Sequence, residues 1–217
     1  MALDTYTNLK TEVADWLNRQ DLTSKIPTFI TLLEAQVERV LRVRQMETRS
    51  YATLSGQFLA LPPDFLALKG VQLNSDPVTP LDFVSMNELD KIRQRYAGAA
   101  GKPVAYSIIG SELEFAPQPD ADYEIEIVYW ASIPRLTETT QETNWLLVKH
   151  PDVYLFGSLM QAAPYLHNDE RVQLWNSALA GILETIRIED ERARMGGTPL
   201  KMRIKPYGRQ AATTIRR

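Results

Sequence analysis

Apolar residues recur at helical spacing near the start of the chain. Residues 5–18 are predicted to form a helix with one apolar face, made of Leu9, Val13, Trp16 and Leu17. A longer helix is predicted over residues 24–47, with Pro27 in its first turn, where a missing N–H costs nothing. The apolar stripe of this second helix consists of Ile26, Phe29, Ile30, Leu33, Val37, Val40 and Leu41.

Between residues 48 and 134 the apolar period changes from helical to alternating. Pro and Gly interrupt this region, and short strands are predicted over residues 50–54, 57–61, 66–73, 104–109, 112–115 and 123–130. The last strand alternates most clearly, because Asp122, Glu124 and Glu126 should point away from the face that carries Tyr123, Ile125, Ile127 and Tyr129.

Two local signals organise this β-rich region. Gly110 and Ser111 lie between two predicted strands and indicate a tight hairpin turn with glycine first. One helix is predicted over residues 86–96, where Ser85 at the N-cap and Glu88 three residues later are expected to form a capping box.

Helical periodicity returns at Asn144. Pro151 is expected to begin a helix that runs to about residue 163 and is apolar on two sides. Asn168 is expected to cap the next helix. That helix carries a narrow apolar seam suited to one partner helix, namely Val172, Trp175, Leu179, Ile182 and Ile186.

The order of helices, strands and helices predicts an α+β fold rather than alternating βα units. We expect the N- and C-terminal helices to pack into one helical bundle, with the β-rich region as an inserted domain. The expected divisions are residues 1–47 and 136–195 for the bundle, 48–135 for the β-rich domain with one helix, and 196–217 for an extended basic C-terminal tail.

Charge sets the C-terminal tail apart from the rest of the chain. Residues 201–217 read KMRIKPYGRQAATTIRR and hold six basic residues and no acid. The whole chain has a net charge of −3, so removing the +6 of this tail leaves −9 on residues 1–200. An acidic body argues against tight wrapping by DNA but is compatible with a channel wall past which DNA slides. The tail, rich in Gly, Pro and cations, is expected either to order on a partner or to remain a solvated terminus.

Candidate chemistry is sparse. The chain has no Cys, and its two histidines, His150 and His167, are too far apart for a helical ligand pair, so no metal site or cofactor is expected. The acids Glu112, Glu114, Glu124 and Glu126 resemble the paired carboxylates of glycosidases, but strand alternation produces such rows by default. We expect no catalytic residue, no membrane span and no signal peptide.

Three blocks carry a resemblance to a known family: residues 144–175 (NWLLVKHPDVYLFGSLMQAAPYLHNDERVQLW), 59–71 and 101–130. Together with residues 6–42 they resemble the head-to-tail adaptor, or connector, proteins of tailed bacteriophages. The resemblance covers nearly the whole chain. It rests on the order of the blocks, since no single motif is diagnostic.

The resemblance implies a virion structural protein of the neck, assembled in the host bacterial cytoplasm. Its implied partners are the portal protein, a tail tube or nozzle protein, further copies of itself in a ring (expected to be a dodecamer), and the double-stranded DNA that passes through the ring during ejection. The alternatives are another neck or tail-completion or nozzle protein and, in a different class, a cell-wall-degrading virion enzyme.

Two sets of site residues follow from the resemblance. The C-terminal segment of such adaptors grips the portal, and the corresponding residues here are Lys201, Met202, Arg203, Ile204, Lys205, Tyr207, Arg209, Arg216 and Arg217. An acidic lining would suit fast DNA transit through the ring, because attraction to the wall would slow the DNA. The candidates for this lining are Glu184, Glu189, Asp190 and Glu191, which could equally form a solvated outer face.

Overall fold

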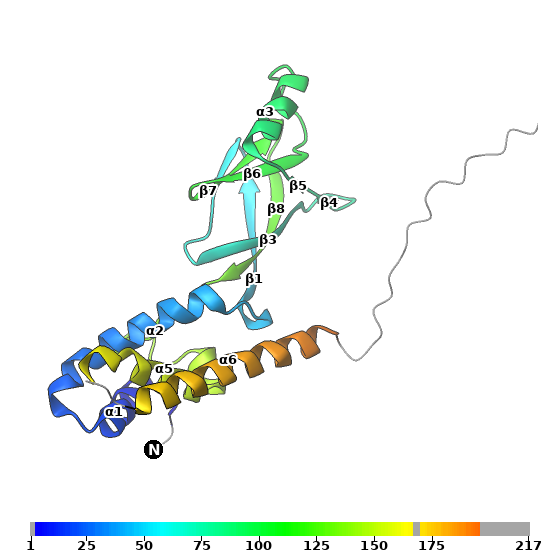
Figure 1. Cartoon of the computed structure of the whole chain (residues 1–217). Coiled ribbons are helices and arrows are strands. Elements are labelled where there is room, and N and C mark those ends of the chain that lie inside the picture. Colours follow the sequence, from blue (N-terminus) through cyan, green and yellow to red (C-terminus); the bar gives the residue numbers. More distant parts are fainter. Residues whose placement is uncertain (1–2, 167–169, 196–217) are drawn as a thin grey trace, which may run out of the picture.

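The computed structural model describes residues 3–166 and 170–195, and it has a helical part and a β part that meet at an angle (Figure 1). The long helices of the helical part are α1 (Tyr6–Leu17), α2 (Ile26–Val40), α5 (Pro151–Gln161) and α6 (Arg171–Met195). Shorter helical turns are η1 (Gln20–Lys25), η2 (Arg44–Met46), α4 (Trp145–Lys149) and η3 (Ala163–Tyr165). The predicted α+β fold class is confirmed.

Helix α5 lies at the centre of the helical part, where it packs against α1, α2, α4 and α6. Pro151 is its first residue, and His150 just before it has a non-helical backbone, as the sequence predicts. Val153, Leu155 and Leu159 are all buried, so the expectation of an apolar helix covered on two sides is confirmed. The seam of α6 packs onto it through Trp175, Leu179 and Ile186, which are the buried members of the predicted row. The predicted cap Asn168 lies outside the described residues.

Helix α2 is shorter than the periodicity predicts. It ends at Val40, and Leu41 already has an extended backbone (φ −87°, ψ 130°). Leu41 and Val43 are both buried, and their spacing of two is the period of a strand rather than of a helix. Val40, expected in the apolar stripe, is 65% exposed, and Trp16 on α1 is 42% exposed at the edge of the core, where its ring meets Phe156.

The β part holds two four-stranded sheets, in the orders β1-β8-β3-β4 and β2-β7-β6-β5. The strands that the sequence predicts are observed with small shifts, as β1 (Glu47–Leu54), β2 (Phe58–Ala60), β3 (Phe65–Leu73), β6 (Ala105–Ile109), β7 (Glu112–Ala116) and β8 (Tyr123–Ala131). Two strands of two residues, β4 (Thr79–Pro80) and β5 (Asp82–Phe83), are not predicted, because so short a run has no readable period. All neighbouring strands are antiparallel except β5 and β6.

Strand β8 lies between β1 and β3 and provides the centre of the β core. Ile125, Ile127 and Tyr129 are buried there, as the alternation predicts. Glu126, predicted to point to the opposite face, is buried as well. It pairs with Arg49 (3.2 Å) and accepts a hydrogen bond from Gln72 (3.2 Å), and these neighbouring strands compensate for its lost hydration.

Of the two local features predicted in the β part, the glycine turn is observed and the capping box is not. Gly110 has φ +60° in the two-residue turn between β6 and β7, which favours glycine at this position. Helix α3 (Met86–Arg95) follows Ser85 as predicted, but the Ser85 side chain makes no capping hydrogen bond. Glu88 instead pairs with Lys91 at 3.0 Å, so the expected capping box does not form.

Gly157 permits the close approach of α5 to α2. A Cβ atom at Gly157 would lie 2.9 Å from Cγ of the buried Leu33 and nearer still to its methyl groups. We therefore expect Gly157→Ala to lower the free energy of unfolding by about 1–3 kcal/mol, the usual cost of overpacking a core. Gly181→Ala on α6 is the control, since a Cβ there meets nothing within 4 Å and should stabilise the helix by up to about 1 kcal/mol. Equal denaturation midpoints for the two variants would contradict this packing account.

Candidate interaction surfaces around the elbow

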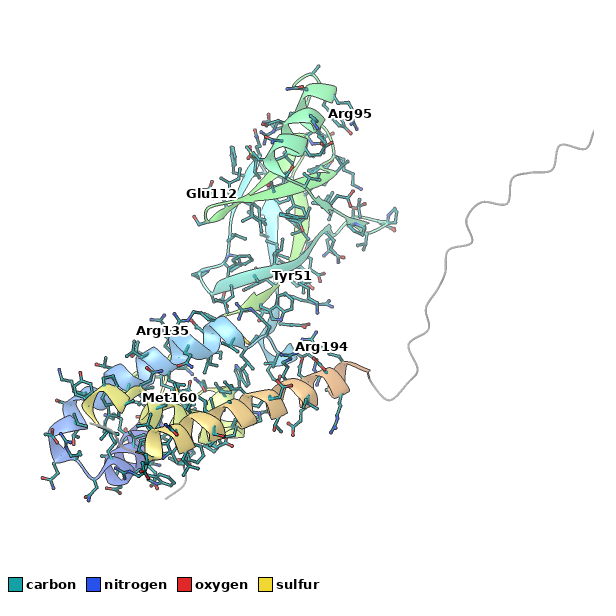
Figure 2. The ribbon with its side chains drawn as sticks, in the orientation of Figure 1. Tyr51, Arg95, Glu112, Arg135, Met160 and Arg194 are labelled. Carbon is teal, nitrogen blue, oxygen red and sulfur yellow. The ribbon has the colours of Figure 1, made fainter. Side chains whose placement is uncertain are left out.

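One charged network joins the end of α6 to the β part, and we call its residues, Arg44, Glu47, Lys69, Asp190 and Arg194, the elbow. Glu47 at the start of β1 pairs with Arg194 (2.8 Å) and with Lys69 on β3 (2.6 Å). Asp190 accepts hydrogen bonds from Nε of Arg194 (2.6 Å) and from the backbone N–H of Arg44 (2.7 Å). Figure 2 shows Arg194 at the end of α6, below the β part. The elbow thus fixes the place from which residues 196–217 continue.

Both carboxyl groups of the elbow are poised to remain ionised. Burial alone would raise the pKa of Glu47, but its hydrogen bonds with Lys69 and Arg194 outweigh burial and hold the pKa below its ordinary value. Burial likewise opposes ionisation of Asp190, and its hydrogen bonds with Arg194 and the Arg44 N–H lower its pKa. These groups therefore stabilise the folded chain above their ordinary pKa values of 4.5 and 3.8, and this contribution is lost as the pH falls through the lowered values.

We expect Asp190→Asn to lower the free energy of unfolding by about 1.5 kcal/mol at pH 7, the lower value for a hydrogen bond to a charged group. The difference from the wild-type chain should narrow as the pH is lowered from about 5 to about 2, below the ordinary pKa of 3.8 and through the lowered value, because the wild-type carboxylate is then being neutralised as well. Thermal melts over this pH range measure the effect, with Glu189→Gln on the exposed face of the same helix as the control. A deficit that stays constant down to about pH 2 would show that the charge of Asp190 is not what stabilises the elbow.

A groove of about 620 Å³ runs along α6 from Ala180 to Arg194, opposite Val40 at the end of α2 and residues 41–43 that follow it. Its apolar surface comes from Val40, Leu183 and the wall formed by Trp130 of β8, and Glu184, Arg187 and Glu191 stand along it. The groove reaches the elbow, because Asp190 and Arg194 line it too. An exposed apolar surface with charged borders is typical of a site for a protein segment.

Apolar side chains also remain exposed on the second sheet of the β part. Phe58 on β2 and Phe83 on β5 lie on the two edge strands and are 55% and 63% exposed. Ile109 at the end of β6 is exposed as well, beside the turn where Figure 2 labels Glu112. Such aromatic edges are candidates for contact with another protein.

The structure separates the acids that the sequence groups as channel-lining candidates. Glu184, Glu189 and Glu191 are exposed on α6. Arg187 lies near Glu184 (3.8 Å) and Glu191 (3.6 Å), which reduces the net negative charge of this face. Asp190 differs from the other three, since it is mostly buried in the elbow, where Arg194 and the Arg44 N–H hold its carboxylate. Whether these acids face DNA stays a prediction.

The predicted portal-binding residues, from Lys201 to Arg217, lie outside the described residues. Their role therefore also stays a prediction. The described chain does fix where this segment begins, because Arg194 on the last turn of α6 is held by both Glu47 and Asp190.

The four acids considered for glycosidase chemistry do not form an open pair. Glu114 is buried and is held by Arg93 of α3 and by Gln57 (2.9 Å), and Glu126 is buried between β1 and β3. Glu112 and Glu124 are exposed on strands of different sheets. Two of these carboxylates thus serve the packing of the β part. Of the two histidines, His150 precedes α5 and His167 lies outside the described residues. Within residues 3–166 and 170–195, no group of three or more His, Asp or Glu side chains is placed to hold a metal ion.

A buried polar chain in the helical part is missed by the sequence reasoning. Oε1 of Glu34 on α2 accepts hydrogen bonds from the Leu136 N–H (2.9 Å) and from the Tyr154 hydroxyl (3.2 Å). That hydroxyl accepts one from Nδ2 of Asn144 (2.7 Å), whose Oδ1 caps α4 at the Leu147 N–H (2.8 Å). Burial raises the pKa of Glu34, and its two donors offset this only in part. This series of buried hydrogen bonds therefore connects α2, α4, α5 and the segment that returns from the β part.

A signal for this polar chain is present in the sequence. Glu34 stands four residues after Ile30 and three before Val37, and so it falls inside the apolar stripe of α2. An acid at such a position is either a misassigned face or a buried group with dedicated partners. The structure establishes the second reading.

Comparison with known proteins fits these surfaces. None of the described helices is both long and apolar enough to cross a bilayer. No curated protein matches the chain. The sequence profile of the SU10 adaptor protein family matches residues 4–203, which confirms the resemblance to head-to-tail adaptors. The match extends over both parts of the structure and well beyond half of the chain, and the protein therefore belongs to the SU10 adaptor protein family.

Proposed function

We propose that the protein is a structural head-to-tail adaptor that forms a ring below the portal, joins capsid to tail and lets DNA pass. The observation that carries this proposal is the family match over residues 4–203, which includes the helical part, the β part and the start of the basic tail. An adaptor of this kind resides in the neck of the virion and is assembled in the cytoplasm of the host.

The two parts of the chain suit different contacts in such an assembly. The helical part, with its large shared core, forms the wall of the ring, which we propose to be a dodecamer. The β part faces the tail tube or nozzle protein, and the exposed edges at Phe58 and Phe83 support this orientation. Closed rings need heterologous contacts repeated by rotation, so each copy presents two different faces to its neighbours.

The basic tail is the portal-binding element of this proposal. Residues 200, 202, 204 and 207 are apolar and alternate with Lys201, Arg203 and Lys205, which is the period of an extended strand. Such a segment fits the edge of a partner's sheet, where main-chain hydrogen bonds provide affinity and alternate side chains provide specificity. The elbow supports this role, because it fixes the origin of the tail.

Two alternatives lead to different observations. Another neck component, such as a tail-completion or nozzle protein, would not co-purify with the portal protein alone, whereas an adaptor does. A cell-wall-degrading enzyme would clear peptidoglycan in a zymogram. Membership of an adaptor family and the burial of Glu114 and Glu126 both favour the structural role.

A further inference from the structure

The groove between α2 and α6 has an apolar floor that the described residues leave open. Val40 is 65% exposed there, although it continues the apolar stripe of α2. Trp130 forms one wall. Apolar surface left in water costs free energy, and an apolar segment lying in the groove would cover it.

The chain's own C-terminal segment starts at the end of this groove. Arg194 lines the groove, and α6 ends one residue later at Met195. Residues 196–217 are therefore tethered at the groove, and a tether this short gives an effective concentration in the millimolar range. A separate partner of equal intrinsic affinity would have to be present at about that millimolar concentration to occupy the groove as often.

The sequence of the segment matches the groove. Residues 200, 202 and 204 are apolar and suit its floor, while the basic residues between them would meet Glu184 and Glu191 on its border. Arg187 contacts both glutamates at 3.8 and 3.6 Å, but these pairs are exposed and weak, so a second cation can replace it.

The lengths agree as well. From Arg194 back to Ala180 the groove follows α6 over a rise of about 21 Å, since fourteen helical steps of about 1.5 Å separate these residues. The eight residues 200–207 span about 26 Å when extended. Gly196 and Gly197 follow α6 directly, and glycine is the residue that most readily adopts the backbone angles needed to reverse the chain at a helix end.

From these observations we propose that the groove between α2 and α6 is the docking site of the chain's own residues 200–207. The segment lies antiparallel to α6 in the free subunit and leaves the groove when it binds to the portal protein. The docking stands on the groove and the tether alone, whereas the release step rests on the proposed function.

Disulfide trapping tests the docking directly, because the chain has no Cys of its own. The variant Val40→Cys/Met202→Cys places one thiol on the groove floor and one in the segment. The control Val148→Cys/Met202→Cys uses a residue of α4 that is 62% exposed, against 65% for Val40, and does not line the groove. In the full-length, dilute protein we expect the groove pair to form an intrachain disulfide at least about tenfold faster than the control, as tethered docking implies.

A second pair, Ala180→Cys/Tyr207→Cys, tests the direction at the far end of the groove and should also form an intrachain disulfide. Thermal melts of the reduced variants check that each one folds. Equal rates for the groove and control pairs would overturn the proposal, and so would disulfides that form only between chains, since the occupant would then be a second copy. Portal protein added before oxidation should suppress the intrachain disulfide. If it does not, the release step fails and the portal role is weakened, while the docking result remains.

Discussion

Deletion of residues 196–217 should weaken portal binding by about a hundredfold or more and leave folding almost unchanged. A hundredfold corresponds to about 2.7 kcal/mol, a modest loss for a segment with five large apolar and six basic side chains. The midpoint of thermal unfolding should fall by no more than about 4 °C, because the described helices and strands form their cores without this segment and only its docking in the groove, worth about 1 kcal/mol, is lost. A portal pull-down over a salt series, with a thermal melt of the same samples, measures both effects.

Charge reversal within the tail is a second variant, and charge reversal outside the tail is its matched control. Reversal of Lys201, Arg203 and Lys205 should weaken portal binding and flatten its dependence on salt, because the electrostatic part of the attraction is then lost. The same number of reversals at exposed basic residues of the β part, namely Lys91, Arg95 and Lys102, should leave portal binding intact. If the truncated chain binds portal as tightly as the full chain, the tail has no part in attachment.

Glu34→Ala should strongly destabilise the helical part. It leaves the Leu136 N–H and the Tyr154 hydroxyl without their acceptor, and each unsatisfied buried group costs about 1–3 kcal/mol. We therefore expect the free energy of unfolding to fall by about 2–5 kcal/mol. Chemical denaturation monitored by circular dichroism provides the measurement.

Glu34→Gln distinguishes the hydrogen bonds from the charge. Its amide oxygen can still accept from the Leu136 N–H, and it removes a carboxylate whose pKa is raised by burial. Because a raised acid pKa means that the ionised group opposes folding above that pKa, this variant should lose less stability at pH 7 than Glu34→Ala. The difference in free energy of unfolding between Glu34→Gln and the wild type should shift in favour of the wild type as the pH falls below the raised pKa. Wild-type Glu34 is then protonated and no longer opposes folding. Equal losses for both variants would contradict this account, because the acceptor that Gln retains would then contribute nothing and the effect would belong to the carboxylate charge that both variants remove.

Periodicity was sufficient to predict most of the fold. The buried face of α1 and the seam of α6 follow from spacings of three and four, and β8 follows from strict alternation. The predictions that failed concern features that tertiary contacts determine. Helix α2 ends early because Leu41 and Val43 are both buried in an extended segment, an outcome that the next part of the structure imposes. Strands β4 and β5 exist only through their pairing with β3 and β6, and no local pattern marks them.

The candidate sites were less predictable than the fold. The basic tail stands out from composition alone, yet the elbow that fixes its origin joins residues 44, 47, 69, 190 and 194, which nothing in the sequence connects. Asp190 shows the limit most clearly, because in sequence it is one of several acids on α6, and only the approach of Arg44 and Arg194 makes it a buried structural group. The proposed function rests on family membership, because local chemistry offers no candidate activity.

The most direct test of the adaptor assignment is the mass of the assembly, measured by light scattering with and without the portal protein. We expect the 24.7 kDa chain to be a monomer or small oligomer when alone and dilute, and to form a closed ring of many copies on the portal. The portal supplies the template, and each added copy contributes contacts to the portal and to its neighbour. A stable dimer that forms without the portal and shows no larger ring in its presence would contradict the account.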